Sequence, residues 1–553
     1  MDKIRRLVSR CDSLHSCYDA ETEKPALPTR VVDISRGPEQ ILLREGTGIQ
    51  DHYVCLSHCW GSKQPLQTTT RNIENHQRNI PWDMFPVVYK EAILISWELG
   101  IKYVWIDSLC IVQDSVIDWQ RESASMCNVY AGSYLTVAAT SSADCSVSML
   151  EPLLSEGPRE ERERTTECRI SNQDDLEQPG HSLISMVESK HGYWDHDFAA
   201  FYDIYRHMPL LSRAWTYQEQ LLSPRLIHLT PTELVWQCKR GVLCNCGYMN
   251  FSGAEFDLPF YRVMETESSQ SGDSDGRQIA SLWRSIVMRY SKRQLTYDKD
   301  KLPALSGLAH MFSQKRPGAK YLAGAWRDAD SPSLLLDLMW HRRIELTARN
   351  DNGETRCKDW VAPSFSWASI RAEVGSLEEV YVDVLEAHCE PSTLDPMGQV
   401  KSGFLKVRGR ALAGCVIATE YAGGFCDLIL DDGRVHGFIA DVEKDELWGA
   451  GIGPKNTMRV DVVCVPWARV CRTIMIDDVV FYSGEEWAVV LHSTADSDSK
   501  SSINSRVFNR VGMLRGRFLK RSCKTKEEYD AFWAQSPALF GDKRQEFHTF
   551  TIL

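Results

Sequence analysis

Residues 211–238 read LSRAWTYQEQLLSPRLIHLTPTELVWQC, a helical segment followed by two strand-like segments. Trp215, Glu219 and Leu222 stand at positions i, i+4 and i+7, so one carboxylate shares a helix face with two large apolar side chains. A carboxylate in such a place needs a partner, has a raised pKa or takes part in chemistry. Arg213 is the nearest candidate partner, so a buried structural Glu–Arg pair and a functional Glu219 are both open.

Alternating strands and helices precede this stretch. The apolar segment YVCLS at 53–57 predicts a strand, the pattern over 85–99 predicts a helix that Gly100 ends, and KYVWIDSLCI at 102–111 predicts a second strand. A strand, a helix and a strand at this spacing form a βαβ unit, whose two strands are parallel.

The same alternation continues to about residue 250. A helix is expected over 118–130, a third strand in YLTVAAT at 134–140 and a fourth in RLIHL at 225–229. Residues from about 141 to 208 break the pattern and contain the charged run GPREERERTTE, which is typical of a solvated insertion. The sequence therefore predicts a doubly wound, flavodoxin-like parallel α/β sheet that carries an insertion.

The 553 residues are too many for one hydrophobic core, and four parts are expected. They are an N-terminal segment at 1–45, the α/β domain at 46–250, a loop and helical segment at 251–350, and a β-rich C-terminal domain at 351–553. The run TESSQSGDSDGRQ at 266–278 has the composition of a mobile loop. Asp431-Asp432-Gly433 is typical of a hairpin turn between two strands of the last part.

Polar side chains cluster where the predicted strands end. Ser57 and His58 follow the first strand, and Asp107 ends the second. Because ligands bind beyond the carboxyl ends of strands in open α/β sheets, we expect these residues to line one crevice with Arg213 and Glu219.

Composition excludes several classes of protein. A net charge of −12 without a long basic run argues against nucleic-acid binding. The N-terminus lacks the apolar core of a signal peptide, and no run approaches the roughly 18 apolar residues of a membrane span. We expect a soluble cytoplasmic protein whose 18 cysteines are buried thiols in a reducing compartment.

The cysteines raise two possibilities, a zinc site and a cysteine nucleophile, and the sequence favours neither. Cys238, Cys244 and Cys246 lack a second pair at zinc-site spacing, so no metal site is predicted. A nucleophile built from Cys59 or Cys110 with His58 is conceivable, although cysteines inside apolar runs are usually inert. No Walker, GxGxxG, HExxH or GxSxG motif is present.

Three blocks resemble those of the fungal heterokaryon-incompatibility (HET) domain family. They are YVCLSHCWG at 53–61, YVWIDSLCIVQDSVIDWQRESASMCNVYAGSYLTVAA at 103–139 and LSRAWTYQEQLLSPRLIHL at 211–229. The later segments RYSKRQLTYDKDKLPALSGLA, YLAGAW and PSFSWASI are similar to the flank that follows the domain in many filamentous-fungal members. The resemblance implies a protein of non-self recognition that triggers growth arrest or cell death.

HET domains in turn resemble TIR domains. YVCLS is similar to the first TIR strand with its terminal serine, and VWID is similar to the strand that ends in Ile-Asp or Leu-Asp. Trp215-Thr-Tyr-Gln-Glu219 is similar to the TIR W-x-x-x-E, whose glutamate is catalytic in the NAD-cleaving members. The resemblance implies a TIR-like fold and a catalytic role for Glu219.

Cleavage of the nicotinamide–ribose bond passes through an oxocarbenium-like state, which a nearby carboxylate stabilises. NAD is accordingly expected as a substrate, and no resident cofactor is predicted. The candidate binding residues are Ser57, His58, Trp60, Asp107, Arg213 and Trp215. Trp60, Trp105 and Trp215 are candidates for stacking on the bases of NAD, with core packing as the alternative for each.

Two other functions stay open at this point. One is a non-catalytic adaptor that signals through self-association, and the other is a scaffold adopted for tailoring a secondary metabolite. We expect self-association in either signalling case, because TIR-like domains signal by oligomerising. Another incompatibility-locus protein is a candidate partner.

Overall fold

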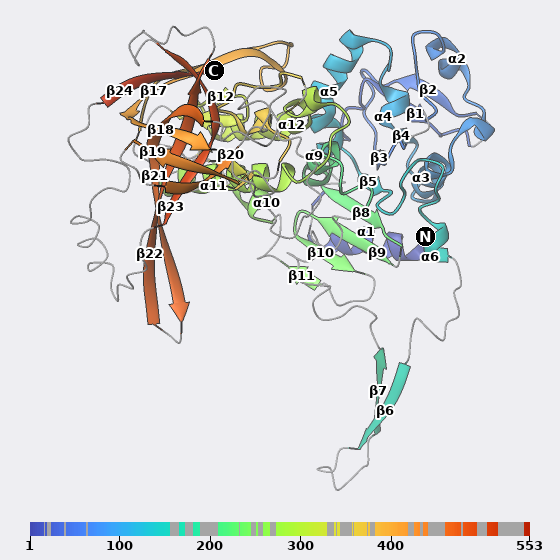
Figure 1. Cartoon of the computed structure of the whole chain (residues 1–553). Coiled ribbons are helices and arrows are strands. Elements are labelled where there is room, and N and C mark those ends of the chain that lie inside the picture. The colour runs from blue at the N-terminus through green and yellow to red at the C-terminus, as the bar shows by residue number, and fades with distance from the viewer. Residues whose placement is uncertain are drawn as a thin grey trace, which may run out of the picture. The chain divides into compact units, whose positions relative to one another are not determined.

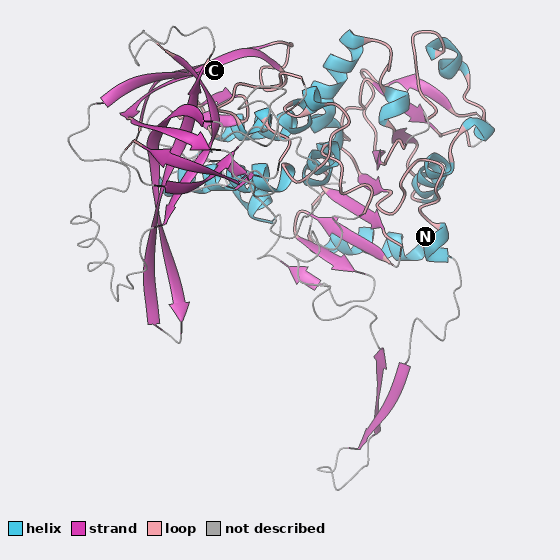
Figure 2. Cartoon of the chain, in the orientation of Figure 1, coloured by secondary structure: helices cyan, strands magenta, loops and turns pink. Residues whose placement is uncertain are grey.

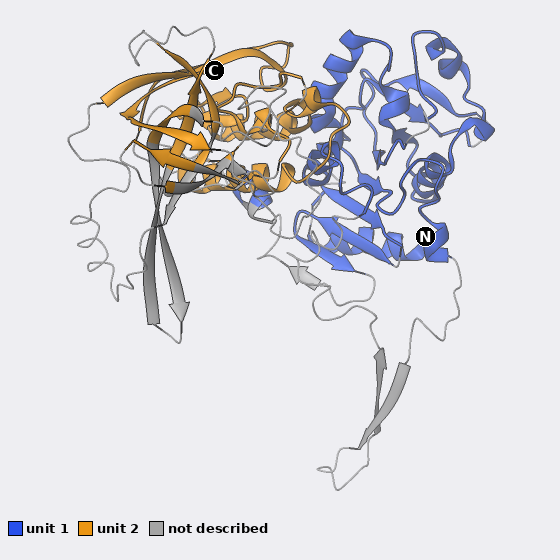
Figure 3. Ribbon diagram, viewed as in Figure 1, with its two compact units in different colours: residues 1–265 blue, residues 266–553 orange. Residues whose placement is uncertain are grey.

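The chain folds into two compact units, Met1–Glu265 and Thr266–Leu553 (Figure 1; Figure 3). The computed structural model describes residues 1–15, 17–18, 24–37, 40–61, 65–154, 165–171, 181–187, 208–231, 233–244, 250–252, 258–265, 273–328, 337–338, 340–342, 357, 359–372, 374–375, 382–417, 425–431, 435–440, 459–476, 479–494, 506–517 and 547–553.

A nine-stranded sheet forms the centre of the first unit, in the order β11-β10-β9-β8-β5-β3-β4-β1-β2. Strands are drawn in magenta in Figure 2. Its strands are β1 (Arg30–Asp33), β2 (Leu42–Glu45), β3 (Tyr53–Ser57), β4 (Tyr103–Trp105), β5 (Leu135–Ala138), β8 (Arg225–Leu229), β9 (Leu234–Cys238), β10 (Gly241–Cys244) and β11 (Asn250–Ser252). The predicted parallel pairing is confirmed for β3 with β4, β3 with β5 and β5 with β8.

Antiparallel strands extend this sheet at both edges. The sheet is therefore mixed, whereas the sequence predicted a parallel sheet. On one side β1 pairs with β4 and β2, and on the other β9 pairs with β8 and β10. The connections from β8 to β9 and from β9 to β10 are short turns, which can join only antiparallel neighbours.

Four neighbouring strands of this sheet, β3, β4, β5 and β8, are parallel. Every residue of β3, β5 and β8 is buried, as expected for strands that are covered on both faces. Taken in chain order, β3, β4, β5 and β8 lie in the sheet as 2-1-3-4, which is the flavodoxin-like order. In sheets of this order, ligands usually bind beyond the carboxyl ends of the first and third strands, which correspond to β3 and β5.

Helices form close to where the sequence predicts them. Gly100, with a φ of 75°, follows α3, and Ser115 caps α5 by accepting a hydrogen bond from the backbone N–H of Asp118 at 3.3 Å. The α-helices among the described residues of this unit are α1 (Asp2–Leu14), α2 (Ile73–Arg78), α3 (Val87–Glu98), α4 (Asp107–Cys110), α5 (Val116–Ala131), α6 (Glu151–Leu154), α9 (Trp215–Leu222) and α10 (Leu258–Glu265).

The predicted insertion contains regular structure. Helix α6 lies within it, and β6 (Thr165–Ser171) pairs with β7 (His181–Val187) in an antiparallel hairpin. Most of the charged run before Thr165 lies outside the described residues.

The second unit contains another nine-stranded sheet, which agrees with the predicted β-rich C-terminal part. The strand order is β16-β17-β24-β23-β20-β19-β18-β21-β22, and β22 also pairs with β23, which closes six strands into a ring. The strands are β16 (Asp383–Pro391), β17 (Val400–Arg410), β18 (Leu412–Ile417), β19 (Phe425–Leu430), β20 (Val435–Ala440), β21 (Arg459–Ile476), β22 (Val479–Ser493), β23 (Val507–Arg517) and β24 (Phe547–Ile552). The hairpin predicted around Asp431 joins β19 to β20.

Helices α11 (Asp273–Tyr290) and α12 (Pro303–Lys315) precede this sheet, where the sequence predicts helices. The prediction of a loop up to residue 278 is wrong from Asp273 onward. Acidic residues in the first turn of a helix interact favourably with its dipole, so the polar composition of this segment also suits a helix start. Two short antiparallel strand pairs are also described in this unit. The hairpin of β12 (Lys320–Leu322) and β13 (Ala325–Arg327) is the first, and the second joins β14 (His341–Arg342) to β15 (Val374–Gly375), which follows about 30 residues later in the chain.

Candidate functional site

The carboxyl ends of β3, β4 and β5 meet at one edge of the first sheet. Ser57 ends β3 and pairs with Ala138, the last residue of β5. Asp107 follows β4 and begins α4. After β3 the chain turns at Gly61, where φ is 80° and a Cβ would lie 2.0 Å from the Cβ of Asp144, so only glycine fits. This edge therefore gathers side chains from two strand ends and one tight turn.

Glu219 lies in the middle of α9, and its carboxylate reaches the end of β3. The side chains of α9 from Thr216 to Leu222 are all buried, and Glu219 is 6% exposed. The Ser57 hydroxyl donates a hydrogen bond to Oε2 of Glu219 at 2.6 Å. Burial raises the pKa of Glu219 to about 7, although the hydrogen bond from Ser57 and the positive charge of Arg213 lower it. The carboxylate thus titrates near neutral pH.

Burial dominates the electrostatics of Glu219. A carboxylate that is held by a close ion pair has a pKa below its usual range. For Glu219 the effect of burial outweighs the attraction of Arg213. Burial, and not a close ion pair with Arg213, therefore sets the pKa of this carboxylate.

Asp107 gathers the polar groups on the other side of the site. Trp60 Nε1 donates to Oδ2 of Asp107 at 2.9 Å, and the backbone N–H of Ser108 donates to Oδ1 at 2.7 Å. His58 Nδ1 lies 3.8 Å from the same Oδ1. Burial lowers the pKa of His58, so the imidazole is neutral near pH 7 and this contact is not an ion pair. The other ring nitrogen, Nε2, hydrogen-bonds the hydroxyl of Tyr89 at 2.9 Å.

The three candidate tryptophans have different surroundings. Trp105 is 1% exposed and packs edge-to-face against Tyr130 with ring centroids 5.6 Å apart, so it belongs to the core. Trp215 packs edge-to-face on Trp119 of α5, with centroids 6.3 Å apart. Trp60 is held by Asp107 and is partly exposed, as is Trp215. Of the three, only Trp60 and Trp215 therefore have side chains that solvent reaches.

The structure gives no support to a cysteine nucleophile. Burial raises the pKa of Cys110 to about 12 and also raises that of Cys59. Both thiols are therefore protonated at neutral pH, and a protonated thiol is a poor nucleophile. The hydrogen bond of His58 Nε2 runs to a tyrosine hydroxyl.

Two tyrosines of the site were missed in the sequence. Tyr130 on α5 forms a hydrogen bond with Glu219, which lowers the pKa of that carboxylate. Tyr89 on α3 links His58 to Ser108, whose hydroxyl lies 2.8 Å from its own. Both tyrosines lie on apolar helix faces, where the sequence pattern predicts a core residue. Their contacts with Glu219 and His58 depend on the position of the hydroxyl group, which the sequence does not give.

The structure does not bring together the cysteines that the sequence places close to one another near Cys238. Cys238 and Cys244 lie on neighbouring strands, but Cys244 pairs with Val235, three residues or about 10 Å along β9. Cys246 lies outside the described residues. The ligand atoms that surround Cys238 come from the N-terminal segment and belong to Cys11, His15 and Cys17.

Fold and site together define an α/β protein with a buried carboxylate at the carboxyl edge of a flavodoxin-like sheet. The family model described as Heterokaryon incompatibility protein (HET) matches residues 53–219. Residues 53–219, about a third of the chain, therefore form a HET domain. The match runs from the first residue of β3 to Glu219 and contains all seven candidate site residues.

Comparison with the curated proteins gave no match, and comparison with the solved structures gave none either. Among the helices that the structure describes, none combines the length and the apolar character needed to cross a membrane.

Proposed function

We propose that this chain acts in fungal non-self recognition in the cytoplasm, and that its HET domain causes cell death by hydrolysing NAD at the nicotinamide–ribose bond. The observation that carries the proposal is the buried Glu219, with a pKa of about 7 and a hydrogen bond from Ser57 at 2.6 Å. Its position, four residues after Trp215 and beyond the carboxyl end of the first parallel strand, supports the comparison with NAD-cleaving TIR domains.

The chemistry needs a negative group close to the ribose. As the bond between ribose C1′ and the nicotinamide nitrogen breaks, its electron pair leaves with neutral nicotinamide and positive charge develops on the sugar. The ionised Glu219 stabilises that charge, water then forms the new bond to C1′, and a proton is released to solvent. Asp107, whose side chain is 26% exposed, is the accessible acceptor for a sugar hydroxyl, and Trp60 offers an aromatic face beside it.

The direct test is to incubate the purified full chain with NAD and to measure nicotinamide and ADP-ribose by chromatography. The proposal expects equal amounts of the two products, because hydrolysis releases one of each. NAD that stays intact over a wide range of protein concentration would contradict it.

Activity is expected to depend on self-association. Glu219 is 6% exposed in the single chain, so contact between copies of the HET domain is the proposed trigger that opens the site. Specific activity should therefore rise with protein concentration together with the mass measured by light scattering. A chain that stays monomeric and is equally active at every concentration would disprove this trigger. A second incompatibility-locus protein is the other candidate activator.

The raised pKa of Glu219 predicts how stability depends on pH. Its folded-state pKa of about 7 lies above the ordinary 4.5, so the native state holds this proton more tightly than the unfolded state. The stabilisation is complete below the unfolded value and is lost as pH rises through about 7. Between about pH 5 and pH 8, the unfolding free energy of the wild type should fall by about 2 to 3 kcal/mol relative to Glu219→Gln. Urea denaturation at both pH values measures the difference, and an equal change in the two proteins would contradict the shift.

The burial of Glu219 also favours a second function, that of a non-catalytic adaptor. A carboxylate that is 6% exposed and already hydrogen-bonded to Ser57 is suited to holding α9 against β3. An adaptor would self-associate and kill without consuming NAD. The NAD assay, performed on the associated form, separates the two functions.

A further inference from the structure

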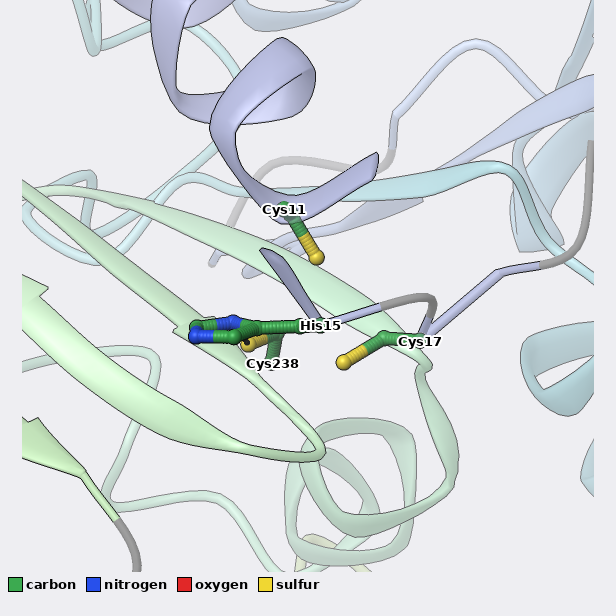
Figure 4. A group of neighbouring side chains, drawn as sticks. All are labelled: Cys11, His15, Cys17 and Cys238. Atoms are coloured by element: carbon green, nitrogen blue, oxygen red, sulfur yellow. Dashed lines mark hydrogen bonds between the residues drawn. The ribbon is translucent and has the colours of Figure 1, made fainter. Parts of the chain in front are cut away.

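Three thiols and one imidazole meet beside the sheet of the first unit. They belong to Cys11 on α1, His15 at the end of that helix, Cys17 just beyond it and Cys238 at the end of β9 (Figure 4). One ligand atom from each lies within 4.8 Å of all the others, and His15 Nδ1 is 3.3 Å from Cys238 Sγ. The three cysteines are buried and free of disulfides, and the histidine is partly buried.

We propose that Cys11, His15, Cys17 and Cys238 form a structural zinc site that fastens the N-terminal helix to the central sheet. In a tetrahedral Cys₃His site, bond lengths of about 2.3 Å for sulfur and 2.0 to 2.1 Å for nitrogen place neighbouring ligand atoms roughly 3.5 to 3.8 Å apart. The four atoms therefore need only small movements to reach this geometry. A donor set of three soft thiolates and an imidazole selects zinc among the common divalent ions.

Helix α1 presents two of the ligands on one face. Ile4, Val8 and Cys11 are its buried residues, at i, i+4 and i+7, and His15 follows Cys11 by four positions. Positions four apart on a helix are neighbours, so a single metal can bind both side chains. Cys17 then follows after the helix has ended and can reach the same point from another direction.

A buried arginine balances the charge of the proposed site. Three thiolates and a divalent ion leave one net negative charge. Arg225 pairs with Cys238 in the register of β8 and β9 and is 0% exposed. Its guanidinium contacts the carboxylate of Asp12 and lies 5.2 Å and 5.3 Å from the ring centroids of Tyr18 and Tyr134. The arginine thus joins the same N-terminal segment to the sheet and supplies a positive charge beside the metal ligands.

The proposed metal would stabilise the fold by joining two segments that lie far apart in the sequence. His15 and Cys238 are 223 positions apart, so their zinc would close a long loop between the N-terminal segment and the far side of the sheet. Because these ligands come together only in the native state, the binding free energy of the metal adds to the free energy of folding. Zinc is therefore expected to hold α1 in place without taking part in catalysis.

The test is the metal content of the full chain, purified under reducing conditions from zinc-supplemented medium and dialysed against a weak chelator. About one zinc per chain is expected. Cys238→Ser should weaken zinc binding by more than the roughly 10- to 100-fold that follows loss of an outer-shell partner. Cys244→Ser is the matched control, because Cys244 is a buried cysteine on the adjacent strand, and it should keep the full zinc content.

A second variant keeps the test decisive if Cys238→Ser folds poorly. His15→Cys replaces the imidazole with a fourth thiolate, so it should still bind one metal, whereas His15→Ala should bind weakly. With cobalt in place of zinc, the wild type and His15→Cys should show the strong visible absorption of tetrahedral cobalt with thiolate ligands. A folded wild type without metal, zinc that survives Cys238→Ser, or a disulfide among the three cysteines in reduced protein would overturn the site.

Discussion

Glu219→Gln is expected to slow NAD cleavage strongly and leave the fold intact. Removing the one group aimed at the developing charge should slow nicotinamide release by about 100- to 1,000-fold. Glutamine keeps an oxygen that accepts the 2.6 Å hydrogen bond from Ser57, and it removes a charge whose burial raises the pKa to about 7. Above that pH the melting temperature should therefore stay the same or rise, and toxicity in a fungal or yeast host should disappear.

A structural role for Glu219 has the opposite signature. If the residue were one half of a buried ion pair with Arg213, the same substitution would cost about 3 to 5 kcal/mol and lower the melting temperature. Glu98→Gln is the control, because the side chain of Glu98 is 54% exposed near the end of α3 and neither activity nor stability should change. A Glu219→Gln protein that melts much lower and still releases nicotinamide would remove this residue from the mechanism.

Arg30→Met should cause the largest loss of stability expected in the first unit. Arg30 is 5% exposed on β1, and its guanidinium lies 2.5 Å from Asp118 and 3.6 Å from Glu122, both on α5. Its Nε also donates to the backbone oxygen of Cys110 at 2.7 Å. Methionine fills the same space but leaves two buried carboxylates with less positive charge near them, so the unfolding free energy should fall by about 3 kcal/mol.

The control for Arg30 is an exposed arginine with two acidic partners. Arg5 pairs with Asp2 and Glu98, and all three side chains are exposed. Arg5→Met should therefore change the unfolding free energy by less than about 1 kcal/mol. Adding Asp118→Asn to Arg30→Met should cost less than the sum of the two single losses, because it removes one of the stranded charges. Equal losses for Arg30→Met and Arg5→Met in urea denaturation would contradict the buried network.

Local patterns were enough to predict the centre of the first sheet. YVCLS and RLIHL are short apolar runs whose residues are all buried in β3 and β8, and the helix between β3 and β4 ends before Gly100 as expected. The antiparallel edges were not predicted, because a segment such as β1 does not encode its partner: β1 pairs with β4, about 70 residues later in the chain. The same limit applies to the ring of strands that β22 and β23 close.

For the candidate site, the general rule on strand ends proved more useful than local patterns. The spacing of Trp215, Glu219 and Leu222 predicts an inward carboxylate on one apolar face of a helix. In the structure nearly all of α9 is buried, so burial is not confined to that face. Ser57 lies 162 positions before Glu219, and only the convergence of strand ends at one sheet edge connects them. No such rule exists for Cys238, so its neighbours from the N-terminal segment were found only in the structure.

The residues that match the HET family model are fewer than the residues that form the first sheet. The family match starts at residue 53 and stops at 219, whereas β1 covers the free side of β4 and β8 covers the free side of β5. A fragment that contains only residues 53–219 would lose β1, β8 and Arg30. It would expose the unpaired backbone N–H and C=O groups of β4 and β5, and such exposed strand edges promote aggregation. A deletion that removes β1 or β8 and spares residues 53–219 is therefore expected to inactivate such a gene, and an allele survey confined to the matched residues would count that gene as intact.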